Sequence, residues 1–327
     1  MTGVYRIVFA ICLAFPVAAA TPPSPVIIDT DMGTDDIMAI ALILSHREIP
    51  VEAITVVNGL AHVQAGAANA RRLVVASGRT GIRVLEGREN PLQGTAGFPP
   101  DWRENADRPV SKLNVPAESG ERAEVWLAHR LRDTAHPPRI LALGPLTNVA
   151  LALAGGNPNS VGEIVLMGGA FRVPGNLGDS AVLKASAPTA EGNFFVDPEA
   201  AARVFRSDVP IRVIPLDATN RVKLDAAFVT RFKETAKGPL AAVVSNVLDG
   251  ARDDIAKGTL YAWDALAAAA LLEPGVATWT PAHVAIRLSG TEAGRSVIEA
   301  GGRNANVALD ANRSRFDGVF LGAFALR

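Results

Sequence analysis

The sequence predicts an α/β fold, with a mixed, mainly parallel central sheet and helices on both of its faces. Short runs of β-branched residues alternate with alanine-rich stretches of helical character, and 49% of the 327 residues are hydrophobic. The predicted strands are apolar throughout, which is typical of parallel strands that are covered on both faces. We expect a single domain, because the sequence shows no linker and no internal repeat.

In chain order the sequence predicts strands at 26–28, 51–57, 84–85, 140–143, 164–167 and 211–214, with helices at 36–45 and 61–78. Asp197-Pro198 begins a further helix, because aspartate is a good N-cap and proline fits the first helical turn. From 224 to 272 the chain is expected to be mainly helical, and a few strands follow. Residues 86–117 and 172–190 interrupt the alternation, and long loops in compact domains are often functional.

The first 20 residues have the pattern of a secretory signal peptide. Arg6 supplies a short basic region, an apolar stretch follows, and alanines at 18–20 offer a cleavage site. We therefore expect a mature domain at 21–327 in the periplasm or outside the cell, with an uncleaved membrane anchor as the alternative. Cys12 is the only cysteine, so the mature chain has no disulfide and no thiolate metal site.

The charge balance points to a small-molecule ligand. A formal net charge of −1 provides no electrostatic attraction for nucleic acid or anionic lipid. We expect no nucleic-acid partner, and no membrane partner after signal cleavage. The sequence has no Walker-type phosphate loop, and the glycines around 168–169 lack the spacing of a dinucleotide fingerprint, so a nicotinamide enzyme is a weak alternative.

Four aspartates occur within eight residues, directly after the first predicted strand: Asp29, Asp31, Asp35 and Asp36. In open α/β sheets, ligands bind beyond the carboxyl ends of the strands. Gly33 permits a tight turn, which would bring the carboxylates together. Their repulsion requires a cation, and oxygen ligands without cysteine or histidine favour calcium or magnesium. A solvated turn with a helix-capping aspartate would explain one or two of the four.

The segment Asp29-x-Asp31-x-Gly33-x-Asp35-Asp36 resembles the signature of the nucleoside hydrolase family, of the inosine-uridine-preferring type. Further segments resemble other elements of that family in the same order: 144–148, 165–169 with 175–176, 191–194 with 197–200, and 263–266. The resemblance covers nearly the whole mature chain. It implies a nucleoside hydrolase-like fold and a homodimer or homotetramer.

The resemblance also implies roles for individual residues. One calcium ion would be held by Asp31, Asp36, Asp264 and the backbone carbonyl of Leu143. The ribose hydroxyls would be bound by Asp35, Asn176, Glu191 and Asn193. Asp31 would also act as the general base toward a calcium-bound water, and Asp29 would organise the loop behind it. The implied reaction converts a ribonucleoside and water to ribose and a free base, which suits nucleoside salvage.

The sequence departs from the family pattern at two places. Trp263 stands where the family has a histidine that is associated with protonation of the leaving base; tryptophan can stack on a base, or can simply be a core aromatic. Asn58-Gly59 replaces the family's Gly-Asn, and Asn58 is expected either to reach the substrate from a shifted turn or only to shape the site. His62 could supply the missing donor, although a solvated role is commoner. Residues 98–103 and the loop between 176 and 191 are expected to line the base pocket.

Two alternatives remain open from the sequence. The chain could be an exported nucleoside- or ribose-binding protein that has lost catalysis, because Trp263 removes the family's acid. It could also hydrolyse another N-riboside, such as nicotinamide riboside, whose better leaving group needs less protonation.

Overall fold

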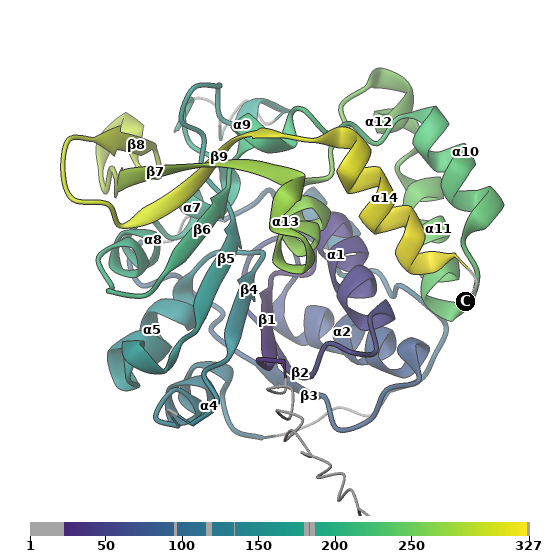
Figure 1. Cartoon of the computed structure of the whole chain (residues 1–327), viewed down its shortest axis with the longest axis horizontal. Helices are drawn as coiled ribbons and strands as arrows, with labels where there is room; N and C mark the ends of the chain where they lie inside the picture. Colours follow the sequence, from purple (N-terminus) through teal and green to yellow (C-terminus); the bar gives the residue numbers. More distant parts are fainter. Residues whose placement is uncertain are drawn as a thin grey trace, which may run out of the picture.

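The computed structural model describes residues 23–94, 97–115, 120–133, 135–179, 183 and 187–325, so the predicted signal peptide at 1–20 lies outside the described residues. In the described part, nine strands form one sheet with the order β3-β2-β1-β4-β5-β6-β9-β7-β8 (Figure 1). None of the described helices combines the length and the apolar character that a membrane span requires.

The strands confirm the prediction of a mixed, mainly parallel sheet. Their bounds are β1 Val26–Thr30, β2 Val51–Val56, β3 Arg83–Glu86, β4 Arg139–Ala142, β5 Glu163–Met167, β6 Ile211–Ile214, β7 Ala277–Ile286, β8 Ser296–Glu299 and β9 Ala305–Ala311. Strands β1 to β6 pair in parallel, and β9 pairs in parallel with β6. Strand β7 runs antiparallel to both β9 and β8, which closes the sheet with a hairpin-like edge.

Helices cover both faces of the sheet, as predicted (Figure 1). One face carries α1 Thr34–Ser45, α2 Val63–Ser77, α11 Pro239–Gly250, α13 Trp263–Leu272 and α14 Arg313–Phe324; the other carries α4 Ala123–Arg130, α5 Thr147–Gly155 and α8 Pro198–Phe205. The remaining α-helices with printed bounds are α3 Pro100–Ala106, α7 Gly192–Val196, α9 Leu216–Thr219, α10 Ala226–Thr235 and α12 Arg252–Lys257. The helix predicted at Asp197-Pro198 is α8, and Asp197 caps it by accepting a hydrogen bond from the Ala200 N–H.

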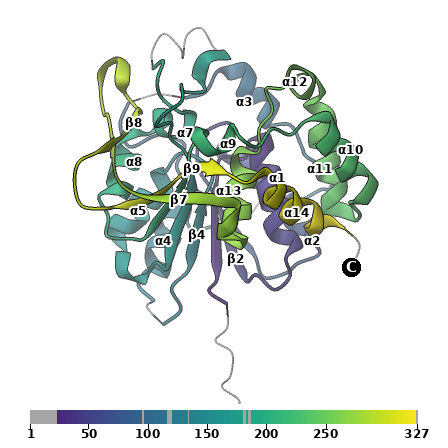
Figure 2. The same cartoon turned by 45° about the horizontal axis from the view of Figure 1, so that its top comes forward.

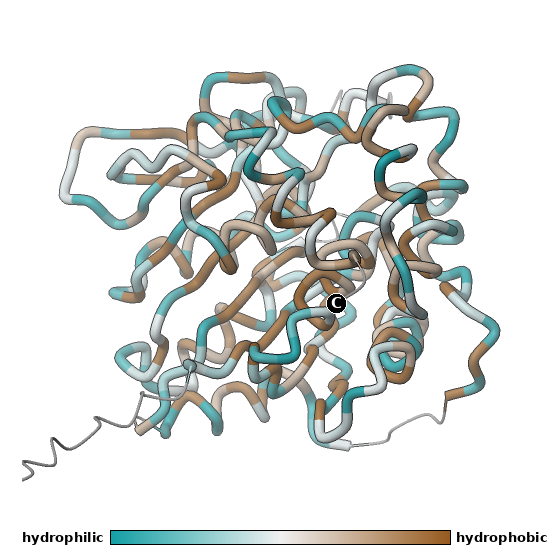
Figure 3. Tube along the Cα trace, turned by 45° about the vertical axis from the view of Figure 1, so that its right-hand side comes forward, coloured by the Kyte–Doolittle hydropathy of each residue, from teal (hydrophilic) through white to brown (hydrophobic). Residues whose placement is uncertain are grey.

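Each central strand contributes side chains to two hydrophobic cores, one on each face of the sheet. Val26 and Ile28 of β1 belong to the core beneath α1, whereas Ile27 belongs to the core beneath α5. Figure 3 shows this as hydrophobic segments that run through the interior of the molecule. Because successive side chains point to opposite faces and both faces are buried, the strands carry no polar alternation.

The strand order defines where a ligand can bind. Strand β1 lies between β2 and β4, and the helices that follow β1 and β2 cover one face whereas those around β4 cover the other. Such a reversal opens a crevice at the carboxyl ends of the strands. Asp31 follows β1 and Leu143 follows β4 at this edge. In Figure 2, α3 lies toward the top of the view, above α7 and α9.

One irregular segment of the sequence contains a helix that we did not predict. Residues 86–117 include α3, which begins at Pro100. Proline at the first helical position lacks only a hydrogen bond that no helix makes there. The helix has seven residues, none of which is fully buried, so its apolar periodicity is too short to detect.

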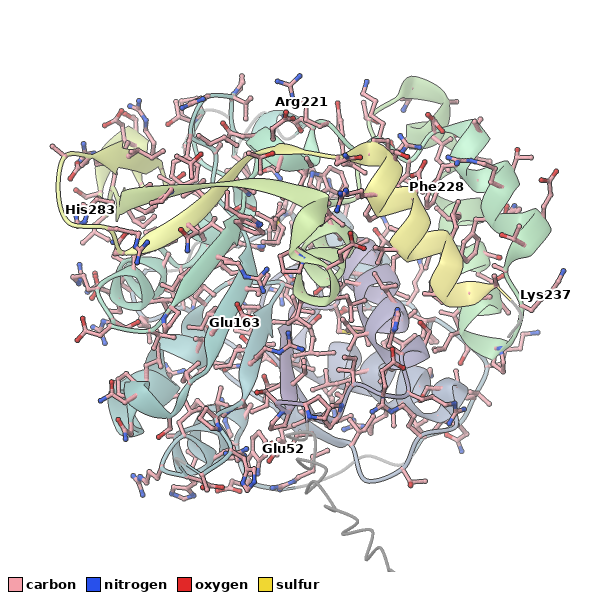
Figure 4. All side chains as sticks on the ribbon, in the orientation of Figure 1. Glu52, Glu163, Arg221, Phe228, Lys237 and His283 are labelled. Atoms are coloured by element: carbon pink, nitrogen blue, oxygen red, sulfur yellow. The ribbon has the colours of Figure 1, made fainter. Side chains whose placement is uncertain are left out.

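A charged cluster anchors the carboxyl end of α13. Arg212 Nη1 donates a hydrogen bond to the Ala270 carbonyl at 2.9 Å, and Arg139 Nη1 donates to the Leu271 carbonyl at 3.1 Å. Glu163, labelled in Figure 4, accepts two hydrogen bonds of 2.8 Å from Arg212. Cations at a helix carboxyl end are favourable because unpaired carbonyls give that end a partial negative charge. The cluster therefore fixes α13 against the amino ends of β4, β5 and β6.

We predict that Glu163→Gln lowers the free energy of unfolding by about 1–3 kcal/mol, because it leaves the largely buried guanidinium of Arg212 without its carboxylate. Glu299→Gln is the matched control, since Glu299 pairs with Arg287 at 2.9 Å on the surface and its loss should cost less than about 0.5 kcal/mol. Urea unfolding of both variants measures the difference. Equal losses would contradict an anchoring role for Glu163.

Candidate active site

The turn that follows β1 has a strained backbone. Met32 has a φ of 56°, a conformation that L-residues adopt only at a cost of order 1 kcal/mol. Its side chain is fully buried, and its N–H donates a hydrogen bond of 3.0 Å to the Thr30 hydroxyl. These contacts hold the turn that leads from Asp31 into Gly33 and α1.

Three carboxylates converge at this turn. One oxygen each of Asp35, Asp36 and Asp264 lies within 4.8 Å of the others, and these side chains come from the first turns of α1 and α13. Asp36 accepts hydrogen bonds from the Thr30 hydroxyl and from the Gly33 N–H. Asp264 Oδ1 is buried and has no hydrogen-bond partner in the described part of the chain. A buried, unpaired carboxylate oxygen beside two others fits a hard cation with oxygen ligands.

Asp31 lies beside this trio. It is buried, and its Oδ2 accepts a hydrogen bond of 2.9 Å from the Leu60 N–H. A Cβ placed on Gly59 would lie 2.0 Å from Asp31 Oδ2, and one on Gly144 would lie 2.9 Å from Asp31 Cβ. Only glycine permits these approaches, so the backbone after β2 and the backbone after β4 both fix the Asp31 carboxylate.

Burial and mutual repulsion raise the pKa values of the whole cluster. Burial, followed by the charge of Asp31, raises the pKa of Asp35 to about 6 and that of Asp36 well above its usual range. Burial, followed by the charge of Asp36, raises the pKa of Asp264 well above its usual range, and burial also raises the pKa of Asp31. Without a cation, the cluster therefore retains protons at a pH where exposed aspartates are ionised.

Asp29 connects three elements behind the cluster. Its Oδ1 accepts hydrogen bonds from the Thr55 hydroxyl at 2.6 Å and from Asn148 Nδ2 at 2.9 Å. Burial raises the pKa of Asp29 to about 7. Asn148 Oδ1 in turn accepts a hydrogen bond from the Arg88 N–H at 3.1 Å. Asp29 thus ties β1 to β2 and α5, while its Oδ2 is buried without a hydrogen-bond partner among the described residues.

Glu191 and Asn193 meet at the ends of β4 and β5. Glu191 accepts hydrogen bonds from the N–H groups of Gly169, Asn193 and Phe194 at 2.9, 2.8 and 3.3 Å. Burial raises the pKa of Glu191 to about 7. Asn193 Nδ2 donates to the Leu143 carbonyl at 2.9 Å and to the Met167 carbonyl at 3.2 Å. The structure thus joins Leu143 and Asn193 directly, two residues that the sequence placed in one site.

Asn176 borders the same region from a more exposed position. Its Oδ1 accepts a hydrogen bond of 3.0 Å from the Gly192 N–H. A Cβ on the preceding Gly175 would lie 1.9 Å from the Ala190 carbonyl oxygen, so the two segments are in direct contact. The loop containing Asn176 is therefore fastened to the start of α7, next to Glu191.

The structure also shows the surroundings of Trp263, Asn58 and His62, which lie at or beside the departures from the family pattern. Trp263 is the first residue of α13, directly before Asp264, and it is half-buried with its ring centroid 5.7 Å from that of Tyr261. Asn58 is buried, and its Oδ1 accepts a hydrogen bond of 2.6 Å from Arg103 Nη2. The ring of His62 pairs with Asp107 at 2.7 Å, and its side chain is 54% exposed.

Several residues that shape the site carried no assigned role in the sequence. Thr30 and Asn148 bind site carboxylates, and Gly59 and Gly144 make room for Asp31. Thr30 lies between two of the clustered aspartates, and Asn148 lies within a segment that resembles the family. Their positions in the sequence could therefore have indicated a role for Thr30 and Asn148. The contacts of the two glycines with Asp31 could not be predicted, because they join segments that are far apart in the chain.

The fold and the site together define a class: a doubly wound α/β protein with a buried carboxylate cluster, suited to a hard cation, at the reversal of strand order. The sequence profile of the inosine-uridine preferring nucleoside hydrolases matches residues 26–318, and the chain belongs to this family.

Individual relatives agree with this assignment. The chain is 34% identical to the pyrimidine-specific ribonucleoside hydrolase RihA of Salmonella typhi over 231 residues, which are 69% of this chain and 70% of that protein. A plant nucleoside hydrolase, PpNRh1, superposes with a TM-score of 0.81 at 26% identity, over 94% of this chain and 100% of that one. The inosine-uridine preferring nucleoside hydrolase of Bacillus anthracis superposes with a TM-score of 0.79 at 25% identity, over 92% and 99% of the two chains.

We predict that the metal-free protein loses stability as the pH rises from about 4 to about 7. The folded-state pKa values of Asp29, Asp35 and Glu191 are about 7, 6 and 7, above their ordinary values of 3.8, 3.8 and 4.5. The folded state therefore binds more protons than the unfolded state in this window, and its stability falls with rising pH. Thermal unfolding in chelator across this range measures the effect, and adding a divalent cation at pH 7 should raise Tm. A Tm in chelator that rises through the window would contradict this.

Proposed function

We propose that this protein hydrolyses the N-glycosidic bond of ribonucleosides to ribose and a free base, with calcium as its metal. The observation that carries the proposal is the convergence of Asp35, Asp36 and Asp264 at the reversal of strand order, with Asp31 fixed beside them. The relatives named above as ribonucleoside hydrolases support the substrate class.

The residues present fit a calcium ion. Asp31, Asp36, Asp264 and the Leu143 carbonyl would hold it, all through oxygen, and calcium accepts six to eight oxygen ligands in flexible geometry. The unpaired Oδ1 of Asp264 supplies one buried oxygen in need of a partner. When bound, calcium would supply a lowered pKa for a water molecule and a common anchor for water and ribose.

In the proposed reaction, Asp31 takes a proton from the attacking water. The Leu60 N–H and the glycines at 59 and 144 hold its carboxylate in one orientation, which is the positioning that a general base needs. The bond to the base breaks through an oxocarbenium-like transition state, as in other glycoside hydrolyses. No covalent intermediate with the protein is required.

Four side chains would bind the ribose hydroxyls: Asp35, Asn176, Glu191 and Asn193. Hydrogen bonds from backbone N–H groups already fix the Glu191 carboxylate, and two strand-end carbonyls fix the amide of Asn193. Trp263 would stack on the base, because its half-buried ring stands directly before Asp264. Asn58 would also contact the substrate, because it precedes Gly59, which lies against the Asp31 carboxylate.

We also propose that the protein acts outside the cytoplasm, where it would release bases for uptake. The signal-like pattern at 1–20 supports this, and a fractionation of cells that express the full chain tests it. The expectation of a homodimer or homotetramer rests on the family resemblance, and sedimentation velocity tests it.

We predict that the wild-type protein releases free ribose from ribonucleosides in calcium and that a chelator abolishes the release. The reason is that, without a cation, nothing neutralises the carboxylate trio or anchors water and ribose at the site. A panel of purine, pyrimidine and nicotinamide ribosides shows which base is preferred. Calcium-dependent binding without release would instead identify a ribonucleoside-binding protein.

We predict that Asp31→Asn lowers kcat by about 10²- to 10⁴-fold, because an amide cannot accept the proton of the attacking water. Calorimetry should still detect binding of the nucleoside. Asp249→Asn is the matched control, since Asp249 pairs with Lys233 at an exposed position and its change should leave kcat unaltered. Wild-type turnover by the Asp31→Asn variant would remove Asp31 from the proposed role.

A further inference from the structure

Helix α3 connects the two sides of the proposed site. Just before α3, Phe98 lies against the first residue of α7, where a Cβ on Gly192 would be 2.9 Å from Phe98 Cζ. Phe98 and Trp102 stack with ring centroids 6.2 Å apart. Gly192 follows Glu191, so this end of the segment adjoins the proposed ribose-binding residues.

The other end of α3 adjoins the turn that holds Asp31. Arg103 Nη2 donates to Asn58 Oδ1 at 2.6 Å and to the Ala61 carbonyl at 3.4 Å. Between these two acceptors lie Gly59 and Leu60, which contact the Asp31 carboxylate. The guanidinium of Arg103 is thus bound to the same four-residue turn that positions the proposed general base.

The position of α3 over this turn is fixed by further contacts. Asp107, directly after α3, accepts hydrogen bonds from the N–H of His62 at 2.8 Å and pairs with its ring at 2.7 Å. Asn69 Nδ2 donates to the Arg108 carbonyl at 3.0 Å. Because these bonds hold the helix independently, the contact of Arg103 with Asn58 is not needed to attach α3 to α2.

Among the residues that the structure describes, Arg103 has no carboxylate partner for its charge. In the described part of the chain no acidic group lies within ion-pair distance of Arg103, and its Nε is buried without a hydrogen-bond partner. A guanidinium carries five N–H donors, so the two carbonyl-type acceptors on Nη2 leave most of its capacity unused. A partly buried cation of this kind is costly unless an acceptor arrives.

We propose that Arg103 donates a hydrogen bond to the base of the bound ribonucleoside and stabilises the negative charge that develops on it. This rests on the proposed function and names the group that acts in place of the family's histidine, which is Trp263 here. Asn58 orients the guanidinium by accepting a hydrogen bond from Nη2.

The step balances without any further reactant. The C1′–N bond breaks, and its electron pair goes to the nitrogen of the base. The water oxygen forms the new bond to C1′, and its proton goes to Asp31. Arg103 keeps its proton, because a guanidinium does not act as an acid in proteins, and stabilises the base anion until solvent protonates it. Asp31 then returns its proton to solvent.

The test compares substrates that differ in their need for help at the leaving group. Arg103→Gln is assayed on uridine and inosine and on p-nitrophenyl β-D-ribofuranoside, whose nitrophenolate carries its charge unaided. We predict a loss of about 10²- to 10³-fold in kcat on the nucleosides, comparable to the loss of one transition-state donor, and less than about 10-fold on the nitrophenyl riboside. Arg108→Gln, with the same change of charge on an exposed residue of the same segment, should lose neither activity.

Three outcomes would overturn this role. Equal losses on both substrate types would mean that Arg103 only holds the Asn58 turn, and undiminished nucleoside turnover would mean that it contacts nothing that matters. A wild-type fall in nucleoside kcat above a pKa between about 6 and 7 would identify a histidine acid instead. Failure of the wild type on every riboside is separate from these results, because it would reject the proposed hydrolase function itself, and the role of Arg103 with it.

Discussion

The repulsion among buried carboxylates is the constraint on which the rest of this structure depends. Asp31, Asp35, Asp36 and Asp264 share one end of the sheet, and burial together with like charge raises the pKa of each. Such an arrangement is unfavourable in a folded protein unless protons or a cation neutralise it. The strained turn at Met32 is a second local cost at the same place. The carboxylate repulsion and the backbone strain thus occur together at the proposed site, as is common at functional sites.

The topology of the sheet explains how distant residues meet at this point. Asp31 follows β1, Leu143 follows β4, and Glu191 lies on a loop that binds the backbone beyond β5, so neighbouring parallel strands deliver them to one edge. Asp264 arrives differently, at the first turn of α13. The Arg139, Arg212 and Glu163 cluster grips the far end of that helix. A rigid helix that is fixed at its carboxyl end fixes the carboxylate at its amino end as well.

Much of this could be predicted from the sequence, because apolar runs identify buried strands and because the four aspartates are neighbours in the chain. The strands at 26–28 and 164–167 are found as β1 and β5, and Asp36 and Asp264 meet as the resemblance implied. The clustering of Asp35 with Asp36 follows from the four-aspartate segment, whereas the resemblance gave Asp35 a ribose-binding role and no place beside Asp264. The contacts of Gly59 with Asp31 and of Asn58 with Arg103 were not foreseen; they join residues 28 and 45 positions apart. Local pattern carries no information on such pairs, since tertiary packing decides them.

Both residues of Asn58-Gly59, the pair that stands where the family has Gly-Asn, make specific contacts in this structure. Glycine at 59 is required because any side chain would collide with the Asp31 carboxylate. Asparagine at 58 lies beside this glycine, and its side-chain oxygen accepts a hydrogen bond from Arg103 of α3. The proposed role of Arg103 would connect the two departures of this chain from its family. A tryptophan before Asp264 can stack on a base but cannot protonate it, and Asn58 binds the cationic side chain of Arg103. A guanidinium stays charged where histidine changes its charge, so leaving-group assistance from Arg103 would not vary with pH in that range, unlike assistance from histidine.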